Sequence, residues 1–247
     1  TSGVVFAHTD HISIDPKGRV HTFCCAVPGA WHVMGVTQGA GLSLKWFRDN
    51  FCAEEKRTAE GMGVDPYFLM DREAERSPIG CNKLLYLPYL MGERTPHLDP
   101  DCRGVFFGLS AIHTKYDMLR AGMEGVTYSQ RDSVEILRGM GVELQEMLAC
   151  GGGGSSPLWR QMLADVYDCP VKTVKSKEGP ALGAAILAGV GAGLYPSVQE
   201  ACDAMIQTNE PQEPISENVP RYDAFYQVYR SLYPALKENF KQLAAAE

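Results

Sequence analysis

The chain has 247 residues, a formal net charge of −7 and 45% hydrophobic residues, which is ample apolar content for a buried core. This length accommodates one large domain or two smaller ones. The negative charge excludes a general nucleic-acid-binding surface, so local N–H groups and a few cations would have to hold any anionic ligand. The sequence contains no run of about 18 apolar residues and no signal peptide, which argues against membrane insertion and secretion.

The eight cysteines favour a reducing compartment. None of them stands in a CxxC pair, and Cys24 and Cys25 are adjacent, which is an unfavourable geometry for a disulfide. Scattered thiols of this kind indicate a cytoplasmic protein. The chain starts at Thr1 without a methionine and runs directly into apolar residues. We therefore interpret it as a piece of a longer chain that begins inside a motif.

The first third of the chain predicts short strands followed by helices. Strands separated by turn residues are expected at residues 4–7, 21–27 and 31–35, and they are arranged most simply as a three-stranded meander. A helix is expected at residues 42–51. Residues 53–82 are charged and contain glycine, and they predict one further short helix.

The alternation of strands and helices continues and predicts an α/β fold. An apolar strand is expected within residues 84–90. Apolar residues then recur every three or four positions over residues 117–138, which predicts a long helix. Short strands at 147–150 and 171–174 precede helices, the second of which is rich in small residues and begins at Gly179.

A run of four glycines, Gly151 to Gly154, is the clearest candidate for a ligand site. It leads from an apolar strand into a helix for which Ser156 is a good N-cap and Pro157 fits the first position. Glycines let the backbone approach an anion closely, and free N–H groups at a helix N-terminus favour negative charge. A flexible loop is the alternative, but the placement between a strand and a capped helix favours a phosphate or nucleotide site.

The C-terminal part of the chain predicts a linker and a helix. Residues 207–221 contain three prolines among polar residues and are typical of a linker. Residues 222–247 carry aromatic and leucine side chains at helical spacing, which predicts an amphipathic helix that Pro234 kinks or divides. We expect this helix to pack back on a domain formed by residues 1–206. A helix that docks a partner protein is the alternative.

Several motifs with known chemistry are absent from the sequence. It contains no GxxxxGK[ST] phosphate loop and no GxGxxG after a first strand. HExxH and GxSxG are absent too, and the six histidines are scattered singly, so no metal site is assigned. His32 and His97 are expected to be structural or peripheral.

Two segments together resemble the second signature of the FGGY carbohydrate kinases. They are residues 104–109 (GVFFGL) and, after seven further residues, residues 117–124 (DMLRAGME). The one departure is Gly122, where the family prefers Ala, Ser, Thr or a β-branched residue. Within the family, residues 87–96 (LPYLMGERTP) and 21–36 are most similar to xylulokinases. Gluconokinases and related pentose kinases carry similar loops. The resemblance covers essentially the whole chain.

The resemblance implies a fold and an activity. FGGY kinases resemble hexokinase and actin in having two ribonuclease-H-like domains about a cleft, with the sugar bound mainly by the N-terminal domain and ATP mainly by the C-terminal one. This chain is similar to the C-terminal domain alone, which implies an α/β, ribonuclease-H-like domain with a mixed sheet flanked by helices. The implied reaction is transfer of the ATP γ-phosphate to a sugar hydroxyl, first of all D-xylulose to xylulose 5-phosphate, with ATP or ADP and Mg²⁺ as cofactors. Gluconate and ribulose are the alternative sugars, and a homodimer stays open.

The resemblance also implies that the glycine run holds the nucleotide. The family's adenosine motif matches residues 150–165, so Gly152 and Gly153, together with Gly151, would lie against the adenosine and phosphates. Ser156 would face the nucleotide, although glycerol kinases of the family have Asn at this position.

A second group of residues is implied on the other side of the nucleotide. Gly41 and Lys45 fall where relatives approach the nucleotide from the helix at residues 42–51. Thr1, Ser2 and Gly3 match the end of the second phosphate motif, whose backbone N–H groups, with the Thr1 hydroxyl, would hold the terminal phosphates.

No catalytic residue is assigned in this chain. Phosphoryl transfer depends mainly on positioning and charge neutralisation, with a base that aligns the attacking hydroxyl. In the family that base is an Asp roughly twenty residues before the Thr-Ser-Gly turn, which places it upstream of Thr1. The chain alone is therefore expected to be inactive. Asp10, Asp15 and Asp99 are interpreted as turn and loop carboxylates.

Glu93 and Arg94 form a charged pair in a loop after an apolar strand. We expect them to line the cleft, because strand ends are where α/β sites form. The alternative is that the two side chains only pair with each other.

Two other functional classes remain open. One is a nucleotide-binding regulator of the same fold that phosphorylates no sugar, against which the xylulokinase-like loop argues. The other is an interaction module in which the glycines only form a turn.

Overall fold

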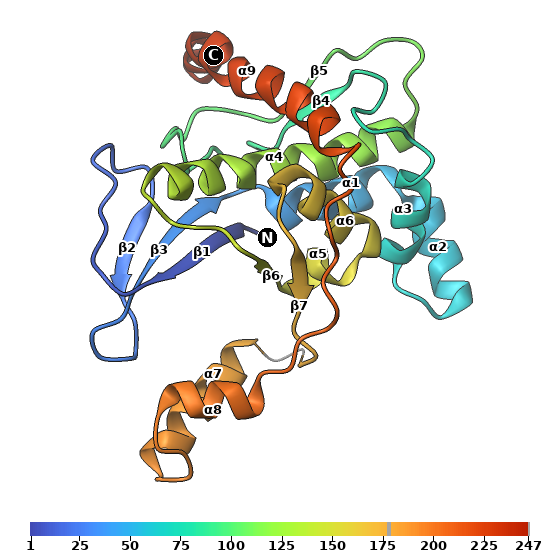
Figure 1. The fold of residues 1–247 in the computed structure, drawn as a ribbon. Helices are drawn as coiled ribbons and strands as arrows, with labels where there is room; N and C mark the ends of the chain where they lie inside the picture. Colours follow the sequence, from blue (N-terminus) through green and yellow to red (C-terminus); the bar gives the residue numbers. More distant parts are fainter. Residues whose placement is uncertain (177–178, 247) are drawn as a thin grey trace.

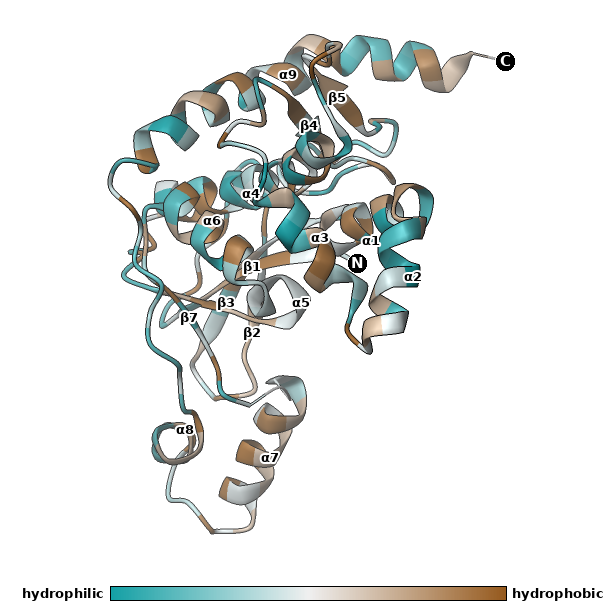
Figure 2. Cartoon of the chain, turned by 90° about the vertical axis from the view of Figure 1, so that its right-hand side faces the viewer, coloured by the Kyte–Doolittle hydropathy of each residue, from teal (hydrophilic) through white to brown (hydrophobic). Residues whose placement is uncertain are grey.

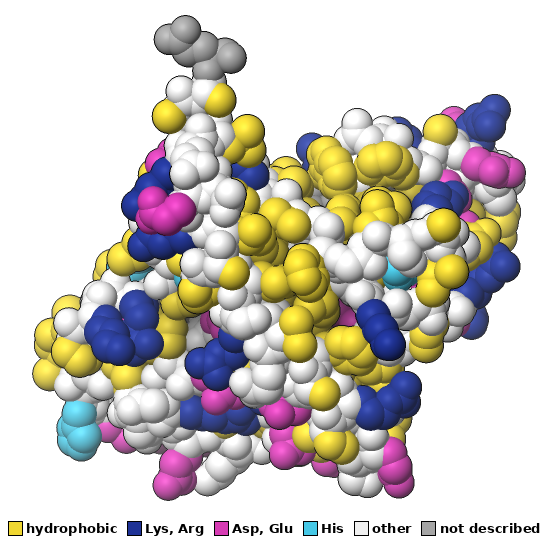
Figure 3. Space-filling view, turned by 90° about the horizontal axis from the view of Figure 1, so that it is seen from above, with side chains coloured by type: hydrophobic (Ala, Val, Ile, Leu, Met, Phe, Trp, Pro, Cys, Tyr) yellow, Lys and Arg dark blue, Asp and Glu magenta, His cyan; other side chains and the backbone are white. Residues whose placement is uncertain are grey.

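The structure of the protein is a computed structural model, which describes residues 1–176 and 179–246. A long central helix, α4 (Lys115–Gly139), crosses one face of a small sheet, and the C-terminal helix α9 (Val219–Ala245) lies over the other side of α4 (Figure 1). Seen from above, the far end of α9 projects beyond the rest of the molecule (Figure 3). The hydrophobic core lies between these layers, and α4 is buried over most of its length.

The sheet has the strand order β1 (Gly3–Thr9), β3 (Trp31–Thr37), β2 (His21–Cys24), and both pairings are antiparallel. The predicted meander is wrong, because β3 and not β2 is central. Residues 10–20 form a long connection that leads from β1 past β3, so that β2 lies on the far side of β3. β3 is the central strand because it carries more buried side chains, such as the fully buried Val33, whereas β2 is half-exposed and suits an edge of the sheet.

Residues 40–74 form the helices α1 (Ala40–Phe51), α2 (Ala53–Met62) and α3 (Pro66–Ala74), where the sequence predicted one helix after residue 51. The break between α2 and α3 has a local cause. Gly63 has a φ of 66° and ends α2, and Asp65 then accepts a hydrogen bond from the Tyr67 backbone N–H at 2.9 Å to cap α3.

The predicted long helix is confirmed and begins slightly earlier than expected. Thr114 and Asp117 form a capping box, in which each side chain accepts a hydrogen bond from the backbone N–H of the other residue. On its outer side α4 packs on the two-stranded sheet of β4 (Leu85–Leu87) and β5 (Val105–Phe107).

The glycine run is helical and not an irregular loop. β6 (Met147–Ala149) pairs in parallel with β7 (Val171–Thr173), and the connection between them holds α5 (Gly151–Ser155) and α6 (Pro157–Tyr167). Gly151 has a φ of 74°, which turns the chain out of β6. The predicted N-cap is confirmed: the Ser156 hydroxyl accepts a hydrogen bond from the Trp159 N–H at 3.1 Å.

The helices α7 (Gly179–Gly191) and α8 (Val198–Met205) pack on each other and lie apart from the main body (Figures 1 and 2). The following segment returns along β7, with bridges from Val171 to Gln212 and from Val174 to Thr208. α9 then runs through Pro234 without being divided. The division into residues 1–206, a linker at 207–221 and a tail stays a prediction.

Two carboxylates meet where α2, α3 and the first turn of α4 pack together. Lys115 donates to Glu55 Oε1, and its Nζ lies 4.0 Å from Glu73 Oε2. Within the described residues, the Oε2 atoms of Glu55 and Glu73 are buried without a hydrogen-bond partner. Burial and the adjacent Glu55 raise the pKa of Glu73 to about 7. Burial raises the pKa of Glu55, but its hydrogen bonds, first of all that from Lys115, lower the pKa overall, so the proton at this pair is expected on Glu73.

We expect Glu73→Gln to gain thermal stability over the wild type as the pH rises. The folded-state pKa of about 7 lies above the ordinary value of 4.5, so the folded chain holds more protons than the unfolded chain between these values. The contribution of Glu73 to stability is therefore present below 4.5 and lost as the pH rises through about 7. The measurement is Tm between about pH 5 and about pH 8. Glu75→Gln, an exposed change at the end of α3, is the control. A Tm difference from wild type that does not change with pH contradicts the prediction.

Candidate functional site

A cavity of about 830 Å³ beside β1 joins the start of the chain to the glycine run. It is lined by every residue to which the sequence assigned nucleotide contact. These are Thr1, Ser2, Gly3, Gly41, Lys45, Gly151, Gly152, Gly153 and Ser156. The cavity therefore brings together two groups of residues that are more than 100 positions apart in the sequence.

The start of the chain is held against the first turn of α1. The Thr1 carbonyl accepts a hydrogen bond from the Leu42 N–H at 2.9 Å. A Cβ on Gly41 would lie 3.4 Å from the Thr1 nitrogen, which is an ordinary contact, whereas a Cβ on Gly3 would lie 2.6 Å from Gln130 Nε2. Lys45 follows one turn later on α1 with its side chain exposed, so a cation stands at this edge of the cavity.

The glycine turn has one packed side and one open side. A Cβ on Gly154 would lie 2.8 Å from the Ala149 carbonyl oxygen, so this position packs directly on β6. Gly151 and Gly152 face open space instead. Arg160 donates to the carbonyls of Gly154 at 2.8 Å and Ser155 at 3.2 Å and holds the end of α5. The backbone of Gly151 and Gly152 is therefore accessible from the cavity, while β6 and Arg160 hold the other side of α5 in place.

Ser156 lies at the cavity wall but is only 8% exposed. Its hydroxyl already accepts the capping hydrogen bond from Trp159. It also lies beside Asp71 of α3: burial raises the pKa of Asp71, and the hydrogen bond from Ser156 opposes that shift. Ser156 therefore caps α6 and also links it to α3 through Asp71.

The wall opposite the glycine turn was missed by the sequence analysis. It comes from the start of α3 and consists of Asp65, Tyr67, Phe68 and Asp71. The Asp-Pro pair at residues 65–66 is a recognisable helix start. Nothing in the local pattern indicates that this helix faces the glycines, because the contact depends on how α3 packs against α4.

The expectation that Glu93 lines the cleft is wrong. Its carboxylate is 3% exposed and accepts hydrogen bonds from the Thr37 hydroxyl at 2.5 Å and the Gln38 N–H at 2.8 Å. The Ser129 hydroxyl of α4 donates to it at 3.2 Å. Arg94 instead contacts His21 Nε2 at 2.7 Å. Glu93 thus ties the end of β3 to α4.

The polar residues of the family-like segment at residues 117–124 also have structural partners. Arg120 donates to Glu124 at 2.9 Å and to the Tyr222 hydroxyl of α9 at 3.0 Å. Glu124 is buried and accepts from the Gly80 N–H at 3.1 Å. This buried ion pair joins α4, α9 and the segment before β4, which explains why the motif is polar although it lies in the core.

Over the described residues, no three His, Cys, Asp or Glu side chains are grouped so that they could hold a metal ion. In the same part of the chain, no helix is both long enough and apolar enough to cross a membrane.

Comparison with known protein families identifies the family of the chain. The C-terminal domain of the FGGY family of carbohydrate kinases matches residues 1–192. The chain belongs to this family. The FGGY assignment confirms the resemblance that residues 104–124 indicated.

Named relatives of this FGGY chain are sugar kinases. It is 40% identical over 238 residues to a xylulose kinase of Staphylococcus epidermidis, covering 96% of this chain and 46% of the relative. It is 35% identical over 246 residues to a gluconokinase of Bacillus subtilis, covering 99% of this chain and 47% of the relative. The chain thus spans about half the length of these relatives.

A solved structure shows the same fold. The ligand-bound xylulose kinase from Lactobacillus acidophilus matches with a TM-score of 0.86 and 26% identity, covering 98% of this chain and 47% of that protein. The predicted α/β, ribonuclease-H-like fold of the actin and hexokinase type is confirmed by this match.

Proposed function

We propose that this FGGY domain binds ATP and ADP in the cavity of about 830 Å³ and forms the nucleotide-binding half of a sugar kinase. The observation that carries the proposal is the meeting of the Thr1–Gly3 turn and the glycine run in one cavity. The reaction proposed for the whole protein is transfer of the ATP γ-phosphate to D-xylulose, giving xylulose 5-phosphate. The identity to xylulose kinases supports this choice of sugar, and the gluconokinase match makes gluconate the second candidate.

The residues of the cavity suit a nucleotide. The open backbone at Gly151 and Gly152 admits the adenosine and phosphates closely. The N–H groups and hydroxyls of the Thr1–Gly3 turn can donate to the terminal phosphates, and Lys45 offsets negative charge. These donors fit a phosphate chain that carries Mg²⁺. Proteins usually bind this ion through substrate phosphates and water, and the ion neutralises phosphate charge.

The sugar and the catalytic base are proposed to lie in the other half of the whole protein. Positioning and charge neutralisation supply most of the rate enhancement in phosphoryl transfer. This chain is proposed to contribute the nucleotide position and phosphate contacts, and to transfer no phosphate by itself.

Gly152→Val is expected to abolish the rise in Tm that ADP causes in the wild-type chain. A Cβ at Gly152 meets nothing within 4 Å, so the added side chain projects into open space without disturbing the fold. Gly61→Val, at an equally open position in α2, is the matched control for the cost of valine in a helix. Thermal unfolding with and without ADP measures both variants. An equal ADP shift in both variants, or no shift in the wild type, would rule out the nucleotide site.

A further inference from the structure

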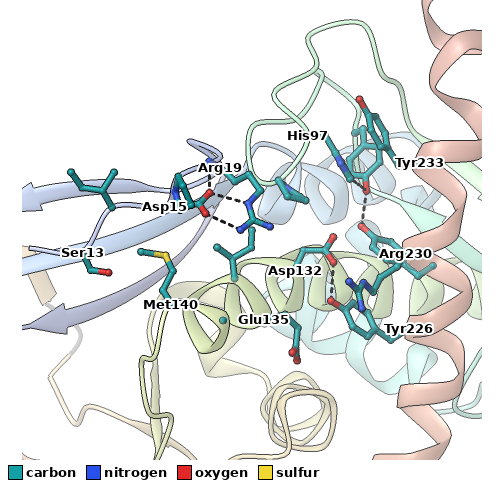
Figure 4. Close-up of a pocket in the computed structure, with 17 residues that line it drawn as sticks. Ser13, Asp15, Arg19, His97, Asp132, Glu135, Met140, Tyr226, Arg230 and Tyr233 are labelled. Atoms are coloured by element: carbon teal, nitrogen blue, oxygen red, sulfur yellow. Dashed lines mark hydrogen bonds and ion pairs between the residues drawn. The ribbon is translucent and has the colours of Figure 1, made fainter.

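A second cavity, of about 550 Å³, lies along the other half of α4 (Figure 4). Its walls come from the connection between β1 and β2, from the loop at residues 96–97, from residues 132–140 and from α9. The described residues that line it and those that line the nucleotide cavity do not overlap. The second cavity is therefore a separate place in the fold.

Most of the charge around this cavity is already neutralised. Arg19 binds Asp15 through two hydrogen bonds, Nε to Oδ2 at 2.9 Å and Nη2 to Oδ1 at 2.8 Å. Glu135 pairs with Arg131 at 3.3 Å and with Arg138 at 2.9 Å, and in Figure 4 it points away from the labelled group around Asp132. These pairs leave no excess charge to select an ionic ligand.

Asp132 is the buried acceptor of the cavity. It is 8% exposed and lines the cavity from α4, and its Oδ1 accepts a hydrogen bond from the Tyr226 hydroxyl at 2.8 Å. Figure 4 shows its carboxylate directed between His97 and Tyr226. A carboxylate has about four acceptor sites, so one hydrogen bond leaves capacity for a ligand that donates. Burial raises the pKa of Asp132 to about 7, and the exposed Arg230 nearby opposes that shift.

The rest of the wall is uncharged and includes four tyrosines and His97. The Tyr89 hydroxyl lies 3.1 Å from both His97 Nε2 and the Tyr229 hydroxyl. The His97 ring stacks on Tyr233 with centroids 3.6 Å apart, and burial lowers the pKa of His97 to about 4, so it is neutral at physiological pH. Aromatic rings and neutral polar groups therefore surround the buried acceptor.

We propose that this cavity binds a small uncharged polyhydroxylated molecule, a sugar or polyol. A ligand hydroxyl donates to Asp132, and the C–H face of the ligand packs on the tyrosine rings. Arg19 and Glu135 are already paired, so neither offers a free charge to an ionic ligand, whereas an uncharged hydroxyl needs none. The volume lies within the range of small-molecule pockets.

The test is titration of the 247-residue chain with xylitol, followed by ligand-observed NMR and calorimetry. Asp132→Asn keeps an oxygen for Tyr226 but replaces the second carboxyl oxygen with an N–H₂ donor, so xylitol affinity is expected to fall about tenfold. Gly139→Leu is a second variant, because Gly139 lines the cavity, a Cβ there meets nothing within 4 Å, and a leucine side chain is expected to occupy part of the space that the ligand needs. It is expected to abolish xylitol binding. Asp10→Asn, an exposed change outside the cavity, is expected to leave the affinity unchanged.

Three results overturn the proposal: no xylitol binding by the wild type, equal affinity in the wild type and both cavity variants, or binding of ethylammonium in place of xylitol. The ADP-induced rise in Tm is measured in the same variants. It is expected to be unaltered, so a failure of this proposal is distinct from a failure of the nucleotide site.

Discussion

Gly125→Ala is expected to lower the free energy of unfolding by about 3 kcal/mol. A Cβ at this position would lie 2.1 Å from the carbonyl oxygen of Tyr86 and 2.9 Å from its carbonyl carbon. Both atoms belong to the backbone of β4, so neither can rotate aside as the end of a flexible side chain does. The methyl group therefore forces α4 away from β4 and loosens the packing of the core between them.

Gly122→Ala, three residues earlier on the same helix, provides the matched control. A Cβ there meets nothing within 4 Å, so alanine brings only its better helix propensity, a gain of about 0.8–1.0 kcal/mol. This is also the position at which the FGGY family prefers Ala, Ser, Thr or a β-branched residue. Urea unfolding of the two variants should shift the midpoint in opposite directions. Equal midpoints would show that α4 does not need glycine at the β4 contact.

Glu93→Ala is expected to lower the free energy of unfolding by about 3 kcal/mol. The carboxylate accepts from the Thr37 and Ser129 hydroxyls and from the backbone N–H groups of Gln38 and Arg94. Removing it leaves the Thr37 hydroxyl and the two N–H groups without this acceptor, while Ser129 can still donate to the Thr37 oxygen at 2.8 Å, and each unpaired buried group carries a desolvation cost. The lost hydrogen bonds lie at the place where α4 passes over the end of β3.

Glu93→Gln and Glu143→Ala complete this test. Glutamine retains an acceptor oxygen but turns an N–H₂ group toward donors, so an intermediate loss of stability is expected. Glu143 is exposed in a loop, and its replacement should change stability by less than about 0.5 kcal/mol. Chemical denaturation measures all three. A Glu93→Ala variant as stable as Glu143→Ala would contradict the role of Glu93 in holding the end of β3 against α4.

The features that the sequence predicted correctly depend on local chemistry. The long helix α4 follows from apolar spacing, and its start follows from the capping box of Thr114 and Asp117. Ser156 and Pro157 mark the start of α6 in the same way. The glycine run and the family resemblance identified the residues that the structure brings into one cavity, although their contact with nucleotide stays a proposal.

The features that were missed depend on contacts between distant segments. Whether β2 or β3 is central is decided by how the long connection at residues 10–20 crosses the sheet, which no local pattern encodes. Glu93 looks like a cleft residue from its loop, but its partners Thr37 and Ser129 are 56 and 36 positions away. The wall formed by α3 has the same origin, because tertiary packing sets the direction in which Tyr67 and Phe68 face.

The helix α4 forms part of both cavities. Its first half gives Leu119, Met123, Val126 and Gln130 to one, and its second half gives Asp132, Glu135, Ile136 and Gly139 to the other. A helix held by backbone hydrogen bonds moves largely as one rod. Any effect that a ligand in one cavity has on binding in the other must therefore, by linkage, be matched by an equal effect of the second ligand on binding in the first cavity.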